Sequence, residues 1–266
     1  MIKMLTRLRN SIMRPVDAWC MKRCTRSLSA THGDFIYSPV LPPVIQFASD
    51  DFNAAWEQAL SNVILRGKPI TFGGKDGAKQ AMDTMQTIVL GNHAVEQILG
   101  EHLHPKFPFQ LVDQYLEEFT PEYLEKYRSQ GSEGFDYIYY DRFDRDDQIL
   151  YMRQGLREQI ESGIQSNRNQ MITWIPRIDQ TKTATPCLQR VGIRYEKDDR
   201  VSVNLSWRSR DLFGAWQINL VGIINTLYRD IIDPNHCEIA RIVDRNDSLH
   251  IYKSDMISAI GVITHA

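Results

Sequence analysis

The C-terminal half of the chain holds a set of reactive and polar side chains next to apolar segments. Cys187 directly follows a proline, and the run Arg208-Ser209-Arg210-Asp211 comes about twenty residues later. Asn219 follows within an apolar segment, and His250 and Tyr252 come last. A cysteine thiolate is a nucleophile, and a side-chain amide offers one hydrogen-bond donor beside one acceptor. The set therefore contains the groups needed for nucleophilic catalysis with polar recognition.

Each of these residues also has a purely structural interpretation. A single cysteine beside strands is commonly a small buried hydrophobe. Arg208 and Asp211 are also compatible with a structural ion pair, and Asn219 with a hydrogen-bonded core amide. Cys187 has no glycine-rich nucleophile turn and no paired His/Asp spacing, which argues against a cysteine hydrolase. No residue of the set identifies a site by itself, so the elements that position them matter.

Hydrophobic periodicity predicts these elements. Apolar residues at helical spacing predict an amphipathic helix over 52–66. Further helices are predicted over 111–128, from Asp147 onward, and from Leu212 to Tyr228. Strands are predicted near Pro69, over 84–92 and over 171–175, and a hairpin joins 191–195 to 201–207 through the charged turn 196–199. The ordered core is expected to end at about His250–Tyr252. This pattern predicts the α+β class.

The composition of the whole chain restricts its class. The net charge of −2 makes nucleic acid an unlikely partner. No apolar run reaches the roughly 20 residues needed to span a bilayer. The four cysteines show no metal-type spacing and no disulfide framework, so we expect no metal and a reducing, cytoplasmic location. Residues 1–50 are expected to form a basic N-terminal extension, either a helical appendage or a targeting presequence, and residues 51–266 the catalytic domain.

Taken together, the polar residues resemble the thymidylate synthase family, most closely its short archaeal-type branch. The family's Pro-Cys motif is matched by Pro186-Cys187, and its His-x-Tyr pair by His250 and Tyr252. The family's Arg-Ser-x-Asp run, with an asparagine further on, is matched by Arg208, Ser209, Asp211 and Asn219. The resemblance covers about residues 137–255. It implies the family's fold, in which helices pack around a largely antiparallel or mixed twisted sheet.

The resemblance implies transfer of a one-carbon unit from 5,10-methylenetetrahydrofolate, or a related pterin, to carbon 5 of dUMP. Cys187 would be the nucleophile that adds to carbon 6 of uracil. Asp211 would act in catalysis and bind the pterin ring. The dUMP-binding residues would be Arg168, Arg208 and Ser209 at the phosphate, Asn219 at the base, and His250 and Tyr252 at the sugar 3′-hydroxyl. The family's dimer implies a homodimer with shared active sites, in which Arg168 reaches the partner's site.

Several positions depart from the family pattern. Asn167 stands where the family has the first of two adjacent arginines, and Leu188 where a histidine usually follows the cysteine. The glycine in 214–217 is shifted. The family's catalytic glutamate is assigned to Glu117, with Glu118 and Glu122 as the next candidates. Because the chain ends at Ala266, we expect the tail that closes over the folate in the family to be missing or replaced.

These departures leave two alternatives open. The product is either dTMP, as in a thymidylate synthase, or 5-hydroxymethyl-dUMP, as in a deoxyuridylate hydroxymethylase. A non-catalytic nucleotide-binding or RNA-binding homologue is the third possibility, supported by the basic N-terminus and by Asn167.

Overall fold

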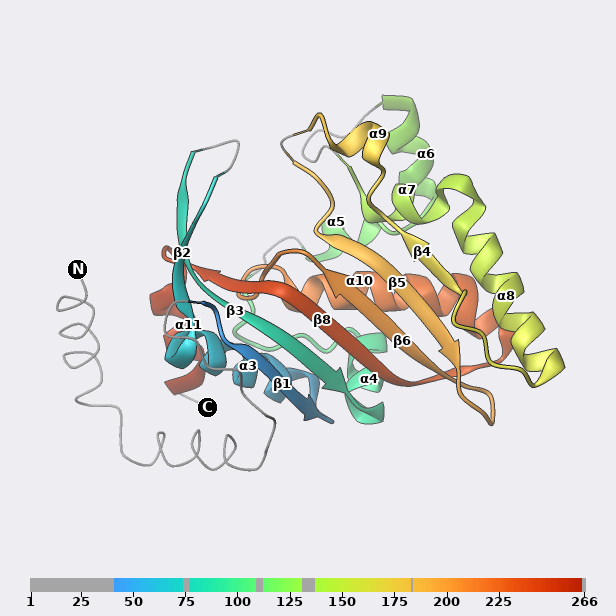
Figure 1. The fold of residues 1–266 in the computed structure, drawn as a ribbon, viewed down its shortest axis with the longest axis horizontal. Coiled ribbons are helices and arrows are strands. Elements are labelled where there is room, and N and C mark those ends of the chain that lie inside the picture. Colours follow the sequence, from blue (N-terminus) through green and yellow to red (C-terminus); the bar gives the residue numbers. More distant parts are fainter. Residues whose placement is uncertain (1–40, 74–76, 109–111, 131–136, 183, 265–266) are drawn as a thin grey trace.

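A mixed sheet forms the centre of the molecule. The computed structural model describes residues 41–73, 77–108, 112–130, 137–182 and 184–264. Eight strands form one sheet in the order β1-β3-β8-β6-β5-β4, with β2 paired to β3 and β7 paired to β8. Helices α3, α4 and α10 lie behind the sheet in Figure 1, and none of the described helices covers the face toward the viewer. The predicted α+β class is confirmed.

The strands combine parallel and antiparallel pairing. Their bounds are β1 (Val44–Ser49), β2 (Lys68–Phe72), β3 (Lys79–Leu90), β4 (Gln170–Ile172), β5 (Leu188–Tyr195), β6 (Arg200–Trp207), β7 (Arg210–Asp211) and β8 (Glu238–Tyr252). β8 lies in the middle, antiparallel to β3 and parallel to β6 and β7. The predicted hairpin is confirmed as β5–β6. Asp198 and Asp199 in its turn both have positive φ, a conformation that aspartate tolerates better than most residues.

The helices are short except for α3, α8 and α10. Their bounds are α3 (Phe52–Arg66), α4 (Asn92–Leu99), α5 (Val112–Glu117), α6 (Pro121–Gln130), α7 (Tyr139–Asp144), α8 (Gln148–Ser162), α9 (Pro176–Asp179), α10 (Trp216–Leu227) and α11 (Met256–Thr264). α3 matches its prediction residue for residue. Its first turn is capped by Asp51, whose side chain accepts a 2.7 Å hydrogen bond from the Ala54 N–H.

α10 is the central helix of the core. Every residue of α10 except Asn225 is buried. A helix that is apolar on all sides is expected in the interior, which explains its place between the sheet and α4 and α5. The helix carries Asn219 near its N-terminal end and so fixes the position of that amide relative to the sheet.

Three sequence predictions were wrong in detail. The helix expected over 111–128 is two helices, because Thr120 caps a new helix whose first residue is Pro121. Residues 44–49, assigned to the N-terminal extension, form β1 and pair with β3 in the sheet. The ordered core does not end at Tyr252, because α11 packs on α3 and buries Ala259 and Val262.

The remainder of the predicted extension, residues 1–40, lies outside the described residues, as do 74–76 of the glycine-rich turn. No helix in the described part of the chain is long and apolar enough to cross a membrane.

Candidate active site

Most of the predicted site residues line one cavity of about 250 Å³. The cavity lies where β7 and the end of β8 meet the start of α10, α5 and the tyrosines at 137 and 139. Its lining includes six of the predicted residues: Cys187, Ser209, Asp211, Asn219, His250 and Tyr252. Tyr115, Tyr137 and Tyr139 supply much of the remaining wall. The structure therefore brings together six predicted residues that lie up to 65 positions apart in the sequence, from Cys187 to Tyr252.

Cys187 lies at the edge of this cavity beside two arginines. The Arg208 Nη2 is 3.8 Å from the Cys187 Sγ, and the same guanidinium donates to the carbonyl oxygens of Thr185 and Pro186. Burial raises the pKa of the Cys187 thiol, and the charges of Arg208 and Arg210, with a hydrogen bond from Tyr137, partly offset that rise. The thiol is thus protonated at neutral pH in the ligand-free protein, with cations in place to stabilise the thiolate.

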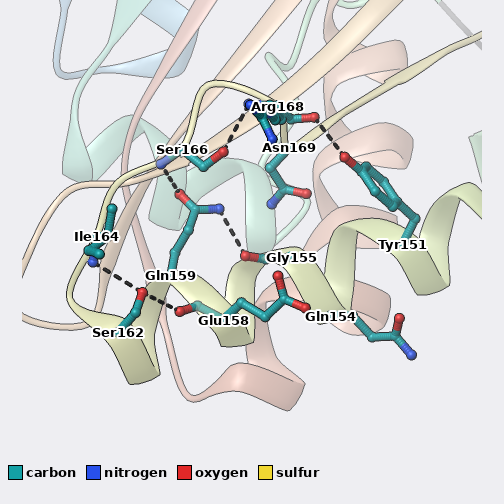
Figure 2. Close-up of a pocket in the computed structure, with 10 residues that line it drawn as sticks. All are labelled: Tyr151, Gln154, Gly155, Glu158, Gln159, Ser162, Ile164, Ser166, Arg168 and Asn169. Atoms are coloured by element: carbon teal, nitrogen blue, oxygen red, sulfur yellow. Dashed lines mark hydrogen bonds between the residues drawn. The ribbon is translucent and has the colours of Figure 1, made fainter.

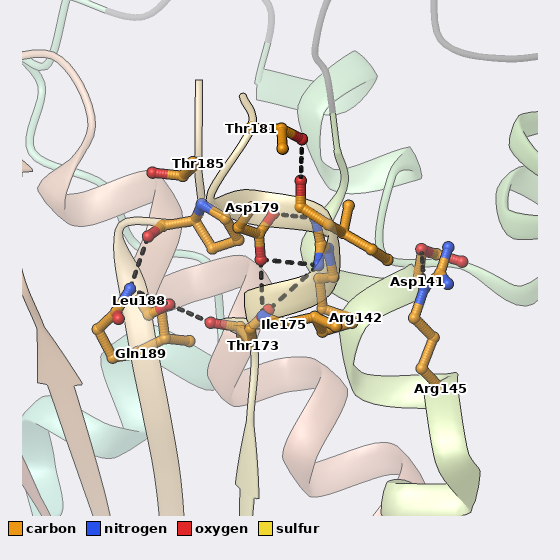
Figure 3. A network of polar contacts seen from close by, with 12 residues as sticks. Asp141, Arg142, Arg145, Thr173, Ile175, Asp179, Thr181, Thr185, Leu188 and Gln189 are labelled. Carbon is orange, nitrogen blue, oxygen red and sulfur yellow. Dashed lines mark hydrogen bonds and ion pairs between the residues drawn. The ribbon is translucent and has the colours of Figure 1, made fainter. Parts of the chain in front are cut away.

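A buried polar network links α7, α9 and Thr173 to the backbone that follows Cys187 (Figure 3). Arg142 on α7 forms a bidentate ion pair with Asp179 on α9, at 2.8 and 3.1 Å. Asp179 also accepts the Ile175 N–H, and the Thr173 hydroxyl donates to the Leu188 carbonyl. The Leu188 N–H donates to the Tyr139 hydroxyl. The backbone on the C-terminal side of Cys187 is therefore fixed from α7 and from Thr173, which follows β4.

Asn219 projects from the first turns of α10 into the cavity and is 8% exposed. Its Nδ2 donates to the Tyr115 hydroxyl at 3.2 Å. An amide nitrogen has a second N–H, and the Oδ1 remains an acceptor. The side chain is therefore held by α5 while it keeps a donor and an acceptor for a ligand.

Asp211 is oriented by the turn that follows it. Its Oδ1 accepts the N–H groups of Phe213 and Gly214 at 3.1 and 3.0 Å. A Cβ at position 214 would lie 2.7 Å from the Asp211 Oδ2, so glycine there allows the carboxylate to keep this orientation. Burial raises the pKa of Asp211 to about 6, against the effect of these two hydrogen bonds. At neutral pH the side chain is mostly a carboxylate that faces the cavity.

His250 and Tyr252 come from alternate positions near the end of β8. The His250 ring is 2% exposed and lies 4.5 Å from the Phe72 ring and 4.8 Å from the Tyr252 ring, measured between centroids. Burial lowers the pKa of His250 to about 4, so the imidazole is neutral at physiological pH. Burial likewise raises the pKa of Tyr252.

The structure places Glu118, not Glu117, at the cavity. Glu117 is exposed at the end of α5, whereas Glu118 lines the cavity beside Tyr115. Burial raises the pKa of Glu118 to about 7, a value suited to proton transfer near neutral pH. Glu122 is exposed on α6 and also lies away from the cavity. Of the three candidate glutamates, Glu118 is therefore the one that lines the cavity, and the first-choice residue Glu117 does not.

Arg168 does not line the Cys187 cavity in this chain. It is exposed beside a second cavity, of about 370 Å³, between α8 and the segment that follows it (Figure 2). The Arg168 carbonyl accepts a hydrogen bond from the Tyr151 hydroxyl, and its N–H donates to Ser166 Oγ. The side chain is thus presented on the surface by the loop that precedes β4.

Sequence reasoning missed Arg210, which also lines the cavity. Its guanidinium is almost fully buried, pairs with Asp244 at 3.0 Å and lies 3.8 Å from the centroid of the Trp207 ring. Asp244 also accepts the indole N–H groups of Trp207 and Trp216. An arginine at the variable position of an Arg-Ser-x-Asp run was the available signal. Tyr115, Tyr137 and Tyr139 gave none, because aromatic residues are expected in any core.

The comparison with solved structures identifies this architecture. Thymidylate synthase A from Bacillus subtilis superposes with a TM-score of 0.58 at 14% sequence identity, over 82% of this chain and 84% of that one. The fold is that of thymidylate synthase. No family model matches the chain.

Curated relatives are archaeal. A protein of Methanothermobacter marburgensis named "Putative thymidylate synthase" is 29% identical over 146 residues, which is 55% of this chain and 64% of that protein. A protein of the same name from Methanosarcina mazei is 25% identical over 205 residues, 76% of this chain and 86% of that protein. The match thus spans less than two thirds of the Methanothermobacter relative's length. The chain has the thymidylate synthase fold and sequence relatives that carry that name in archaea.

Proposed function

We propose that the protein transfers a one-carbon unit to carbon 5 of dUMP, with dTMP as product. The observation that carries the proposal is the convergence of Cys187, Asp211, Asn219, His250 and Tyr252 on one cavity within the thymidylate synthase fold. The order of these residues in the sequence resembles the family's motif, and the cavity gives each of them access to a single ligand.

Cys187 is the proposed nucleophile. Carbon 5 of uracil becomes nucleophilic when a thiolate adds to carbon 6, and elimination of that thiolate later restores the ring. Arg208, 3.8 Å from the sulfur, favours the thiolate and is exposed enough to contact a 5′-phosphate as well. Ser209 follows it at the cavity wall and adds a hydroxyl donor for the same phosphate.

We propose that Asn219 recognises the base and that His250 and Tyr252 recognise the sugar. The free N–H and the Oδ1 of Asn219 complement uracil's carbonyl at position 4 and its N3–H. Cytosine has the opposite pattern at these two positions, which favours a uracil nucleotide. The neutral imidazole and the phenol at the end of β8 suit an uncharged sugar hydroxyl.

The residues of the cavity also fit a reduced folate. The Asp211 carboxylate faces the cavity and is held by two backbone N–H groups, so it can accept paired N–H bonds from a pterin ring. 5,10-Methylenetetrahydrofolate would supply the one-carbon unit and, in a synthase, the hydride. Glu118, with a pKa of about 7, is proposed to relay protons near the base.

The test is release of tritium from carbon 5 of labelled dUMP in the presence of methylenetetrahydrofolate. We expect release by the wild type and none by Cys187→Ala, because exchange at carbon 5 requires thiolate addition and not binding alone. Cys237→Ala is the matched control, since Cys237 is the other free cysteine among the described residues and is buried away from the cavity. Binding of dUMP without tritium release would show a non-catalytic homologue.

A deoxyuridylate hydroxymethylase is the second candidate. Leu188, where the family has a histidine, is fully buried and does not line the cavity. Leucine supplies no polar group at this position, where the family's histidine would supply one. Mass spectrometry of the nucleotide product separates the two reactions: dTMP indicates the synthase, and a product heavier by one oxygen atom indicates the hydroxymethylase.

We also propose that the protein is a homodimer in the cytoplasm. The uncovered face of the sheet presents a row of residues in register, Val89, Val243, Asn204 and Gly192, each only partly exposed. Arg168 projects at the surface, as required if it contacts the partner's nucleotide. Sedimentation should show a dimer that Val243→Asp converts to monomer, whereas Glu96→Lys on α4, behind the sheet, should leave it intact.

A further inference from the structure

His250 is held by a chain of polar groups that runs across two strands. The Ser248 hydroxyl lies 2.8 Å from the Asp83 Oδ1 and 3.3 Å from the His250 Nδ1. Asp83 on β3 is the direct cross-strand partner of His250 on β8. The other ring nitrogen, Nε2, is buried and has no hydrogen-bond partner among the described residues.

The direction of these hydrogen bonds follows from counting hydrogens. A serine hydroxyl has a single hydrogen, and an ionised carboxylate can only accept. Ser248 therefore donates its single hydrogen to Asp83. The Ser248 oxygen can then only accept a hydrogen bond from His250. The histidine must then donate from Nδ1, because two facing acceptors at 3.3 Å would repel each other.

The protonation states agree with this direction at neutral pH. Burial raises the pKa of Asp83 to about 6, against hydrogen bonds from Ser248 and the Thr84 backbone, so it is ionised above that value. Burial lowers the pKa of His250 to about 4, so the ring carries only one N–H. With that N–H at Nδ1, Nε2 is left as a lone-pair acceptor.

We infer that Asp83 and Ser248 are positioning residues that hold His250 in its Nδ1–H tautomer, so that Nε2 presents an acceptor to the cavity and selects a ligand hydroxyl that donates. The ring cannot rotate freely, since Phe72 and Tyr252 pack against it. The identity of the ligand rests on the proposed function, under which the donor is the 3′-hydroxyl of dUMP. The tautomer itself depends only on the protein.

The first test is the tautomer in the ligand-free protein. Proton–nitrogen correlation spectra of the histidine rings, with His250 assigned from its loss in His250→Gln, should show Nδ1 protonated and Nε2 unprotonated at pH 7.5. Ser248→Ala should shift the population toward Nε2–H. Ser248→Thr, which keeps the hydroxyl, and Asp247→Asn, an exposed acid next to Ser248, should retain the wild-type spectrum. An Nε2–H tautomer in the wild type overturns the inference even if Ser248→Ala does not fold.

The second test is selectivity for the hydroxyl. The wild type should bind dUMP roughly tenfold more tightly than 2′,3′-dideoxyuridine monophosphate, the range of one hydrogen bond. The 3′-fluoro analogue, which accepts but does not donate, should bind no better than the dideoxy compound. In Ser248→Ala the affinity for the 3′-fluoro analogue should rise relative to the affinity for the dideoxy compound. If the ratio of these two affinities is the same in Ser248→Ala and in the wild type, the inference is overturned.

The two failures are distinguishable. If the spectra show the Nδ1–H tautomer but dUMP neither binds nor releases tritium, the proposed function fails and the tautomer inference stands. If dUMP is turned over while the wild type carries Nε2–H, the tautomer inference fails and the proposed function stands.

Discussion

At the scale of single residues, the chemistry depends on how Cys187 becomes a thiolate. Burial opposes ionisation of its thiol, and the charges of Arg208 and Arg210 and a hydrogen bond from Tyr137 partly offset this. The sulfur therefore reacts slowly at rest.

Arg208→Gln should slow alkylation of Cys187 by iodoacetamide at pH 8. Removing the cation raises the thiol pKa further, so a smaller fraction is thiolate at any pH below that pKa. We expect a fall of about threefold to tenfold, limited because Arg208 is exposed to solvent and salt. Peptide mass spectrometry follows Cys187 alone. Arg190→Gln, on β5, is the control, and an equal effect there would point to a global change.

Glu118→Gln should lower kcat by about 100-fold, the lower range for loss of a general acid–base group, with little change in KM. Glu117→Gln, one residue earlier but exposed, should stay within about twofold of the wild type. The wild-type pH profile of kcat should show an inflection near pH 7 from Glu118, and this inflection should be absent in Glu118→Gln. A larger loss in Glu117→Gln would return the role to the residue first assigned.

At the scale of elements, the sequence predicts the helices and strands that follow a regular hydrophobic period. It does not predict which residues tertiary packing brings to the cavity. The 3.6-residue pattern of 52–66 and the alternation of 191–207 specify α3 and the β5–β6 hairpin directly. Sequence alone does not separate Glu117 from its neighbour Glu118, because which of the two faces the cavity depends on how the end of α5 packs. Tyr115 on α5 and Arg210 on β7 are recognised only once the tertiary fold brings them to the cavity.

Asp179→Asn should destabilise the protein by about 3–5 kcal/mol. The change leaves the Arg142 guanidinium buried without its counter-charge, since both side chains are almost fully buried. The double variant Arg142→Met/Asp179→Leu should recover part of that loss because it leaves no unpaired charge. Arg145→Ala, which removes a half-exposed partner of Asp141, should cost no more than about 1 kcal/mol. Denaturant unfolding measures all three.

At the scale of the whole molecule, the cavity is built at the expense of stability. Asp83, Asp211 and Glu118 all have a pKa raised by burial, to about 6, 6 and 7. The folded state thus binds these protons more tightly than the unfolded state. Above these pKa values the three groups are ionised in the folded state, and the free energy of unfolding is lower than when they are protonated.

The ligand-free protein should therefore lose stability as the pH rises from 6 to 8. The sign is that of carboxyl groups with a raised folded-state pKa: their contribution is most favourable when they are protonated. His250 does not oppose the trend, since its pKa is lowered in the folded state and its effect lies below about pH 6.5. At pH 8, Asp211→Asn should be more stable than the wild type by on the order of 1 kcal/mol. Thermal unfolding at several pH values is the measurement, and Asp247→Asn, exposed on β8, is the control.

The central place of β8 also governs how the chain can fold. β8 separates β3 from β6, yet it follows all the strands it joins in the sequence. Until residues 238–252 have been synthesised, β3 and β6 each keep an open hydrogen-bonding edge, and the cavity has no His250 or Tyr252. Pairing over such sequence distances makes closure of the sheet slow. The nascent chain therefore has an interval in which those edges are open to other chains, and chaperone binding would be needed most at that stage.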